Sequence, residues 1–269
     1  MKKIVAKNVN RKMFMNLVKQ MLIVDNYVTF KIDNECTDGI SYLPMHDVIK
    51  NMTIKNESLF GEIDELEKPV RISFTDGTKL LNMFKNYKDS DEIDMVIRCE
   101  ENDDEEEMYA IQIETSTDKL KRQEKCADKK FSENNITPLP DNVVSKLFST
   151  DNSDFCFDIS FDDMTQIKSL TNIDRFVKKF VYRVSDGVLY ISERPNLEVK
   201  DDCVYDYKLM DIGEVDDCEF ICNKNIFSVV SLSDFSVCVC ENDGRIVYEH
   251  NGDDERIRLA AVIITPTDN

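Results

Sequence analysis

Two stretches in the first half of the chain carry apolar residues at helical spacing. One runs from Met13 to Leu22, where apolar side chains recur every three or four residues after a candidate N-cap at Asn8 or Asn10. The other covers residues 78–87 and follows Asp76, whose carboxylate is suited to cap a helix. The pattern predicts two short amphipathic helices, each with one buried and one solvated face.

Strands are predicted where apolar and polar residues alternate. Residues 27–32 alternate in this way, and a turn at Asp38-Gly39 is expected to lead into a second strand over residues 40–45. Three further strands of the first half are predicted over residues 70–74, 93–99 and 108–114. The acidic run 100–107 joins the last two, and because its like charges repel one another we expect a solvated hairpin loop.

A polar segment separates the two halves of the chain. The alternation breaks over residues 118–131, and Pro138 and Pro140 follow in a stretch without apolar periodicity. We place a domain boundary near residue 135, which predicts domains of residues 1–135 and 136–269.

The second half repeats the order of elements predicted for the first. Strands are predicted over residues 155–159, 177–184, 188–192, 204–210, 235–240, 245–250 and 259–264, with a hairpin turn at Asp186-Gly187. Helices are predicted from Asp162 to residue 173 and from Asn223 to residue 232. The expected fold class is α+β, with two similar domains that each pack two short helices on antiparallel sheets.

The charge of the chain is strongly acidic. It carries 53 acidic and 34 basic residues, for a net charge of −19. Such an excess disfavours general binding to nucleic acid, because phosphate contacts require clustered lysine and arginine. The predicted helices, however, place basic residues on their solvent faces, which would create a local basic surface on an acidic protein.

The sequence contains no apolar run long enough to cross a membrane, and its first residues lack the pattern of a signal peptide. We therefore expect a cytoplasmic protein with no membrane partner.

The nine cysteines are expected to be small buried residues in a reducing compartment rather than a disulfide framework. Cys238 and Cys240 lie two apart on a predicted strand, which favours packing on one face. A zinc site at Cys218, Cys222, Cys238 and Cys240 is the alternative, but the spacings within the two pairs differ from those of structural zinc sites. We predict no metal and no cofactor.

Catalytic motifs are missing from the sequence. It contains no phosphate-binding glycine loop, metalloprotease motif or nucleophile elbow, and its two histidines are His46 and His250. Paired carboxylates are frequent, but they fall where turns and caps are predicted, as expected of an acidic chain. We predict that the protein is not an enzyme.

Both halves resemble the sliding clamps of T-even-type bacteriophages, which belong to the PCNA-like clamp superfamily. In the second half the resemblance rests on the Pro-x-Pro linker, the helical segment 161–170, the hairpin at Asp186-Gly187, and the strand 205–209 followed by Asp211-Ile212-Gly213-Glu214. In the first half it rests on the opening helix, residues 42–49 and the helix after Asp76.

The resemblance implies a DNA clamp fold and a DNA polymerase processivity factor. Such a protein is a homotrimeric ring that encircles duplex DNA, with helices lining the hole, and its other partners are DNA polymerase and a clamp loader. Encirclement needs no tight grip, so a few long basic side chains that contact phosphates without reading bases permit sliding. The residues expected to face DNA are Arg11, Lys12, Lys19, Lys79, Lys85, Lys168 and Lys224.

Two further surfaces are implied by position within this family. Neighbouring subunits would pair strands 108–114 and 204–210, with Met108, Ile111, Tyr205 and Tyr207 at the interface. Partner peptides would dock in an apolar pocket formed by Leu139, Pro140, Ile264 and Pro266.

Two alternatives stay open. An acidic interaction protein that mimics DNA would use the charge of −19 itself as its functional surface, but it should carry acidic residues on its helices as well as its loops. A cellular-type clamp from a virus of eukaryotes or archaea would share fold and mechanism with the phage type.

Overall fold

The computed structural model describes residues 1–42, 48–100, 106–130, 141–171, 179–193, 205–223, 226–230 and 233–264. The chain forms two compact units. The first contains Met1–Leu43, Lys50–Asp141 and Gly252–Ile257, and the second contains Pro44–Ile49, Asn142–Asn251 and Arg258–Asn269. The boundary predicted near residue 135 lies outside the described residues and stays a prediction.

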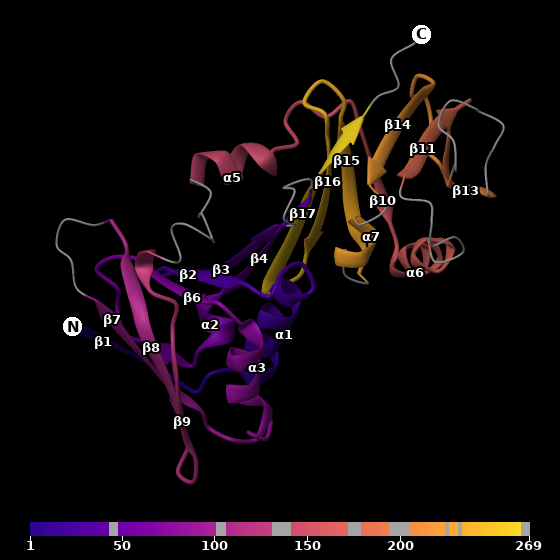
Figure 1. The fold of residues 1–269 in the computed structure, drawn as a ribbon. Helices are drawn as coiled ribbons and strands as arrows, with labels where there is room; N and C mark the ends of the chain where they lie inside the picture. The colour runs from indigo at the N-terminus through magenta and orange to yellow at the C-terminus, as the bar shows by residue number, and fades with distance from the viewer. Residues whose placement is uncertain are drawn as a thin grey trace. The chain divides into compact units, whose positions relative to one another are not determined.

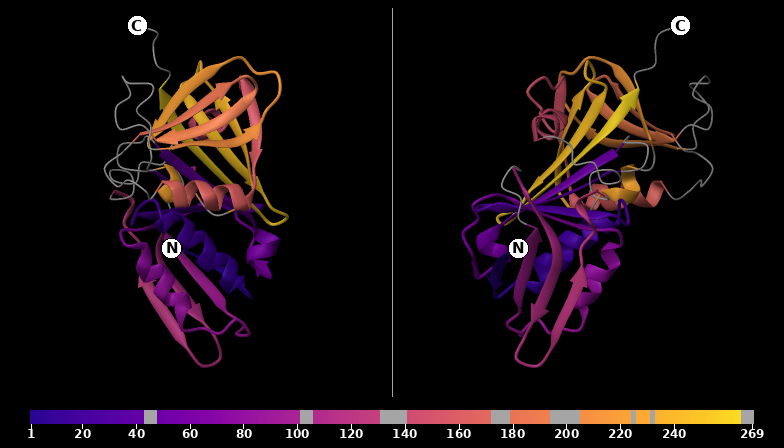
Figure 2. Two further views of the ribbon diagram at one scale, coloured as in Figure 1. Left: turned by 90° about the vertical axis from the view of Figure 1, so that its right-hand side faces the viewer. Right: turned by 60° about the vertical axis from the view of Figure 1, so that its left-hand side comes forward.

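The helices of the first unit are α1 (Arg11–Leu22), α2 (Asn56–Leu59) and α3 (Gly77–Lys85) (Figure 1). The predictions for α1 and α3 are confirmed, because the side chain of Asn10 accepts a hydrogen bond from the Met13 amide and that of Asp76 accepts one from the Thr78 amide. Their apolar faces meet where Phe14 stacks on Phe84, with ring centroids 4.6 Å apart. Figure 2 shows the two helices side by side against the strands of this unit.

The strands of the first unit are β1 (Lys2–Lys7), β2 (Val28–Ile32), β3 (Cys36–Tyr42), β4 (Val48–Lys55), β5 (Glu62–Ile63), β6 (Val70–Phe74), β7 (Asp94–Glu100), β8 (Met108–Ser116) and β9 (Lys121–Lys125). β2 pairs antiparallel with β3 and β6, and β6 pairs in parallel with the start of β8. β7 lies between β1 and β8, while β9 pairs along the second half of β8.

The turn between β2 and β3 lies earlier in the chain than predicted. Asp33 makes the turn, because its carboxylate accepts hydrogen bonds from the amides of Glu35 and Cys36, both at 2.8 Å. Gly39 lies within β3 instead of in a turn. A Cβ atom at this position would come within 3.0 Å of Leu17 Cδ1, so the glycine permits close approach of α1 to the strand.

A buried ion pair anchors the start of β8 to β6. Arg71 is 8% exposed, and its Nε and Nη2 atoms donate to the carboxylate of Glu107 at 2.7 and 2.9 Å. Lys31 Nζ lies 3.6 Å from the same carboxylate. The end of the acidic run is therefore tied to the sheet by two cations.

We expect Glu107→Gln to lower the free energy of unfolding of the protein by about 2–3 kcal/mol, because Arg71 would stay buried without its countercharge. Urea unfolding followed by circular dichroism measures this. Glu106→Gln is the control, since Glu106 is exposed and should change stability by less than about 0.5 kcal/mol. Equal losses in both variants would contradict the anchoring role of the pair.

The helices of the second unit are α5 (Asp141–Leu147), α6 (Phe161–Leu170) and α7 (Ile226–Val229). α6 begins two residues earlier than predicted, because Ser160 is its N-cap in place of Asp162. The Ser160 hydroxyl accepts from the Asp163 amide, and the Asp163 carboxylate accepts from the Ser160 amide, which forms a capping box.

The strands of the second unit are β10 (Phe155–Ile159), β11 (Lys179–Ser185), β12 (Val188–Glu193), β13 (Tyr205–Asp211), β14 (Cys218–Asn223), β15 (Phe235–Cys240), β16 (Arg245–Asn251) and the larger part of β17 (Glu255–Ile264). All pair antiparallel: β11 lies between β12 and β14, β12 also pairs with β13, and β15 lies between β10 and β16. The predicted hairpin at Asp186-Gly187 is confirmed, with φ values of 52° and 73° at the two turn residues.

Two tyrosines cross the core of the second unit. Tyr182 and Tyr248 are fully buried, and their hydroxyls share a hydrogen bond of 2.6 Å. The ring of Tyr182 stacks on Phe220, with centroids 4.9 Å apart. Burial raises the pKa of both hydroxyls well above the ordinary tyrosine value, so this pair stays neutral inside an apolar core.

The structure contains a disulfide that the sequence analysis did not expect. Cys156 on β10 and Cys238 on β15 are joined by an S–S bond of 2.09 Å. The two residues are 82 positions apart in the sequence, but the pairing of β10 with β15 places them directly opposite each other. The prediction that the cysteines serve as packing residues alone is wrong for this pair, and the bond also removes Cys238 from the zinc cluster considered above.

Among the described residues, no helix combines the length and the apolar character that crossing a membrane would require.

Candidate functional site

The outer face of α1 carries two exposed lysines and one arginine that is held in place. Lys12 has a side chain 75% exposed, and Lys19 is exposed in the last turn. Arg11 is half-buried instead of projecting into solvent as predicted, because it donates to the carbonyls of Phe84 and Lys85 at 2.9 and 3.3 Å. Arg11 therefore joins the start of α1 to the C-terminal end of α3, where helix carbonyls attract a cation.

A carboxylate completes this junction. Asp89 Oδ1 accepts from Arg11 at 2.6 Å, and Asp89 Oδ2 lies 3.3 Å from Lys12 Nζ. Lys12 and Arg11 together lower the pKa of Asp89 below its ordinary value. Sequence reasoning did not find Asp89, because it lies in the loop after α3 and follows no motif.

The outer face of α3 carries Lys79 and Lys85, both exposed. A third cation comes from β9, where Arg122 Nη1 donates to the Asn82 carbonyl of α3 at 3.1 Å. The segments α1 and α3 contain five basic residues and no acidic residue. The basic character predicted for these two faces is present in the first unit.

The helices of the second unit differ from this pattern. α6 carries Asp162 and Asp163 and a single basic residue, Lys168. Lys168 is half-buried and its ammonium donates to the carbonyl of Val230, while burial lowers the pKa of this lysine. α6 therefore lacks the acid-free outer face of α1 and α3, because a capping box recruits Asp163. Lys224 lies outside the described residues.

The strand β8, predicted as the subunit edge of the first unit, is not an open edge of its sheet. β8 is paired on both sides, with β7 along one and with β6 and β9 along the other. Met108 is accordingly buried, at 5% exposure, while Ile111 is 37% exposed. Among the described strands, β9 pairs with β8 alone and forms the edge of this sheet.

The hydrogen bonds around β9 show which of its amides point outward. The amide of Cys126 donates to the Ile111 carbonyl, and that of Thr117 donates to the Leu120 carbonyl. Because bonding to one neighbour alternates along an antiparallel strand, the amides of Lys121, Gln123 and Lys125 face away from β8. The outer edge of β9 is therefore open to a further strand.

In the second unit the predicted edge is β13, which pairs with β12 alone among the described strands. Tyr205 and Tyr207 are half-buried, and burial together with Glu193 raises the pKa of the Tyr205 hydroxyl. Asp206 forms an ion pair of 2.6 Å with Arg183. β13 thus offers an open edge with alternating aromatic and charged side chains.

The residues of the predicted peptide pocket lie largely outside the part of the chain that the structure describes. Leu139, Pro140 and Pro266 lie outside the described residues, and for Ile264 the structure gives the backbone pairing with Ile221 but not the side chain.

One cluster of metal-ligand residue types occurs in the described part of the chain, at Asp33, Cys36 and Asp38. The Cys36 sulfur donates to both carboxylates, at 3.6 and 3.4 Å. Burial and the two carboxylates raise the pKa of this thiol well above its ordinary value, so it acts as a neutral donor within the β2–β3 turn.

Two units with short helices packed on antiparallel sheets define the architecture of the PCNA-like clamps, and solved structures confirm this fold. A crystal structure of proliferating cellular nuclear antigen from Entamoeba histolytica is similar with a TM-score of 0.67 and 12% identity, over 97% of this chain and 98% of that chain. A chain of the PCNA2–PCNA3 complex from Sulfolobus tokodaii is similar with a TM-score of 0.61 and 11% identity, over 96% and 98%.

Sequence comparisons add nothing to this finding: no family model and no curated protein matches the chain. The expected fold class is thus confirmed by structure alone. The similar structures come from Entamoeba and Sulfolobus, so they confirm the clamp fold and do not bear out the resemblance to phage-type clamps.

Proposed function

We propose that this protein is a sliding clamp, a DNA polymerase processivity factor that encircles duplex DNA as a ring. The observation that carries the proposal is the charge of α1 and α3: five basic residues and no acidic one, in a chain with a net charge of −19. A random distribution of so many acids would place several on these faces. A basic surface confined to two neighbouring helices suits a polyanion held at that surface and repelled elsewhere.

The chemistry of these residues fits sliding rather than tight binding. Lysines at exposed helix positions contact phosphates through flexible side chains and read no bases. With few such contacts, release and rebinding along DNA cost little free energy, and closure of a ring prevents escape. The protein needs no catalytic group for this task.

The ring would form by head-to-tail addition of β9 from one subunit to β13 of the next, with three copies as the proposed number. β9 carries three basic residues against one acidic residue, whereas β13 carries two acidic residues against one basic residue. Such heterologous contacts between unlike edges form a cyclic ring when the rotation from one subunit to the next closes, as we propose for this chain. Opposite net charge favours this pairing over β9 with β9.

DNA polymerase and a clamp loader are the further proposed partners. We retain Leu139, Pro140, Ile264 and Pro266 as the proposed peptide pocket, because exchange among partners suits short peptides better than a permanent interface.

An acidic DNA mimic is the second candidate, and α6 with its two aspartates is the one observation that favours it. The acid-free faces of α1 and α3 oppose it, since a mimic of DNA would not gather cations on two neighbouring helices.

Encirclement is tested by changing the topology of the DNA. We expect the protein, loaded onto a nicked circular plasmid by its clamp loader, to co-elute with the DNA in gel filtration. Cutting the plasmid once should release it, because a ring slides off a free end. Linear DNA with both ends blocked by streptavidin is the control and should retain the protein.

Retention on unblocked linear DNA equal to that on the circle would contradict encirclement. Absence from every form of DNA, together with competition against other DNA-binding proteins, would support the acidic mimic.

A further inference from the structure

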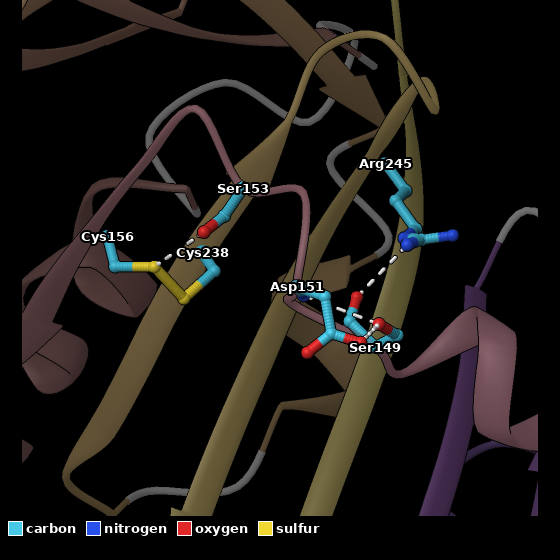
Figure 3. Close-up of a disulfide and its surroundings, with 6 residues drawn as sticks. All are labelled: Ser149, Asp151, Ser153, Cys156, Cys238 and Arg245. Atoms are coloured by element: carbon cyan, nitrogen blue, oxygen red, sulfur yellow. Dashed lines mark hydrogen bonds between the residues drawn. A yellow bond between two sulfur atoms is a disulfide. The ribbon is translucent and has the colours of Figure 1, made fainter.

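The two cysteines of the disulfide between β10 and β15 differ in exposure. Cys156 is exposed and alternates along β10 with buried residues, whereas Cys238 is 8% exposed. Figure 3 shows the bond between the two strands, next to the segment that leads from α5 into β10. We therefore expect a small thiol to approach the bond from the side of Cys156.

The segment 149–154 beside the bond is attached to the strands that the bond connects. The Asp154 amide donates to the Val239 carbonyl at 2.8 Å, and the Asp154 carboxylate accepts from the Glu241 amide at 2.7 Å. Arg245 of β16 donates to the Ser149 carbonyl at 3.0 Å. The segment therefore depends on the position of β15, which the disulfide ties to β10, and on that of β16, which pairs with β15.

A hydroxyl contacts the Cys156 sulfur directly. Ser153 Oγ lies 3.4 Å from Cys156 Sγ. A disulfide sulfur carries no hydrogen, so in the oxidised protein the serine hydroxyl is the donor (Figure 3). This contact would change on reduction, when Cys156 gains a proton of its own.

We propose that Cys156–Cys238 is a reversible exchange site for low-molecular-weight thiols, with Cys156 as the sulfur that is attacked. A thiolate forms a mixed disulfide with Cys156 and the bond to Cys238 breaks, so Cys238 leaves as a thiolate and takes up a proton. A second thiol attacks the mixed disulfide, releases the small-molecule disulfide and leaves Cys156 reduced. In sum, the protein disulfide and two thiols give two protein thiols and one small disulfide, and the reverse reaction uses a small disulfide as oxidant.

The charges around the disulfide should affect how fast cationic and anionic thiols react with it. Asp158 lies on the same exposed face of β10, and its partner Ser236 is opposite Glu249 of β16. The neighbouring cation, Arg245, is paired with Asp243 at 2.9 Å. The charged residues named here sum to a negative charge, so we expect a cationic thiol such as cysteamine to react faster than the anionic thiol glutathione.

The test equilibrates the full-length protein in buffers of reduced and oxidised glutathione, followed by alkylation and non-reducing tryptic digestion. We expect a linked pair of peptides, 147–168 and 225–245, whose fraction falls smoothly as the buffer becomes more reducing. The oxidised protein should show two fewer thiols than its nine cysteines. At equal thiolate concentration and low salt, reduction by cysteamine should be roughly threefold or more faster than by glutathione.

Cys156→Ser should abolish the linked peptides, whereas Cys36→Ser, which changes a half-buried free thiol of the first unit, should leave the titration unchanged. A mixed disulfide trapped during reduction should be found on peptide 147–168. A full thiol count in every buffer, a bond that no reductant opens, or a mixed disulfide on peptide 225–245 would each overturn the proposal.

Discussion

Gln123→Pro is expected to convert the proposed ring into monomers that keep their fold. The amide of Gln123 points away from β8, so proline at this position removes a donor from the open edge of β9 and leaves the pairing of β9 with β8 intact. A ring repeats the same junction between every pair of subunits, so one substitution weakens all of them together. Light scattering at micromolar concentration should show the mass fall from three chains to one.

Gln123→Ala is the matched control, because it removes the same side chain and keeps the amide. This variant should retain the mass of the wild-type protein. Circular dichroism and urea unfolding should show both variants folded, since the position is exposed. If the proline variant assembled as the wild type does, β9 would not be the subunit edge.

Reversing the charge of Lys12, Lys79 and Lys85 together to glutamate should reduce retention on circular DNA and processive synthesis by at least tenfold. Each lysine is exposed on the acid-free faces of α1 and α3, so the triple variant replaces attraction to phosphate by repulsion there. The salt dependence of DNA binding should also become shallower, because fewer counterions are released.

A charge-matched control separates the location of the charge from its amount. Lys3, Lys130 and Lys146 are exposed and lie outside α1 and α3, and their joint replacement by glutamate changes the net charge equally. This control should keep most of its processivity. Equal losses in the two triple variants would mean that overall charge, and not the face of α1 and α3, determines DNA binding.

The elements that the sequence predicted well are those in which local chemistry and tertiary packing agree. α1 and α3 have a capping side chain and an apolar stripe, and β6 alternates within a fully buried strand, so each could be placed within a few residues. The turn between β2 and β3 was predicted at the wrong place because the sequence Asp38-Gly39 is typical of a hairpin turn. In the structure Gly39 lies within β3, where the missing side chain lets α1 pack close to the strand.

The candidate site was harder to predict than the fold, because it depends on neighbours distant in sequence. β9 has the sequence Lys-Arg-Gln-Glu-Lys and no apolar residue, so only its pairing with β8 makes it a strand. Arg11 and Lys168 have suitable helix positions, but nearby carbonyls bind their charged groups. The Cys156–Cys238 bond likewise follows from strand pairing that no local pattern reveals.

The hydroxyl pair in the core of the second unit constrains how this protein can evolve. Changing Tyr182 or Tyr248 alone to phenylalanine would leave one buried hydroxyl without a partner, at a cost of about 1–3 kcal/mol. Changing both would remove the two polar groups together and could be nearly neutral. These two positions, 66 residues apart, are therefore expected to change together among related chains. A chain with a single phenylalanine should be less stable than a chain with two tyrosines or two phenylalanines.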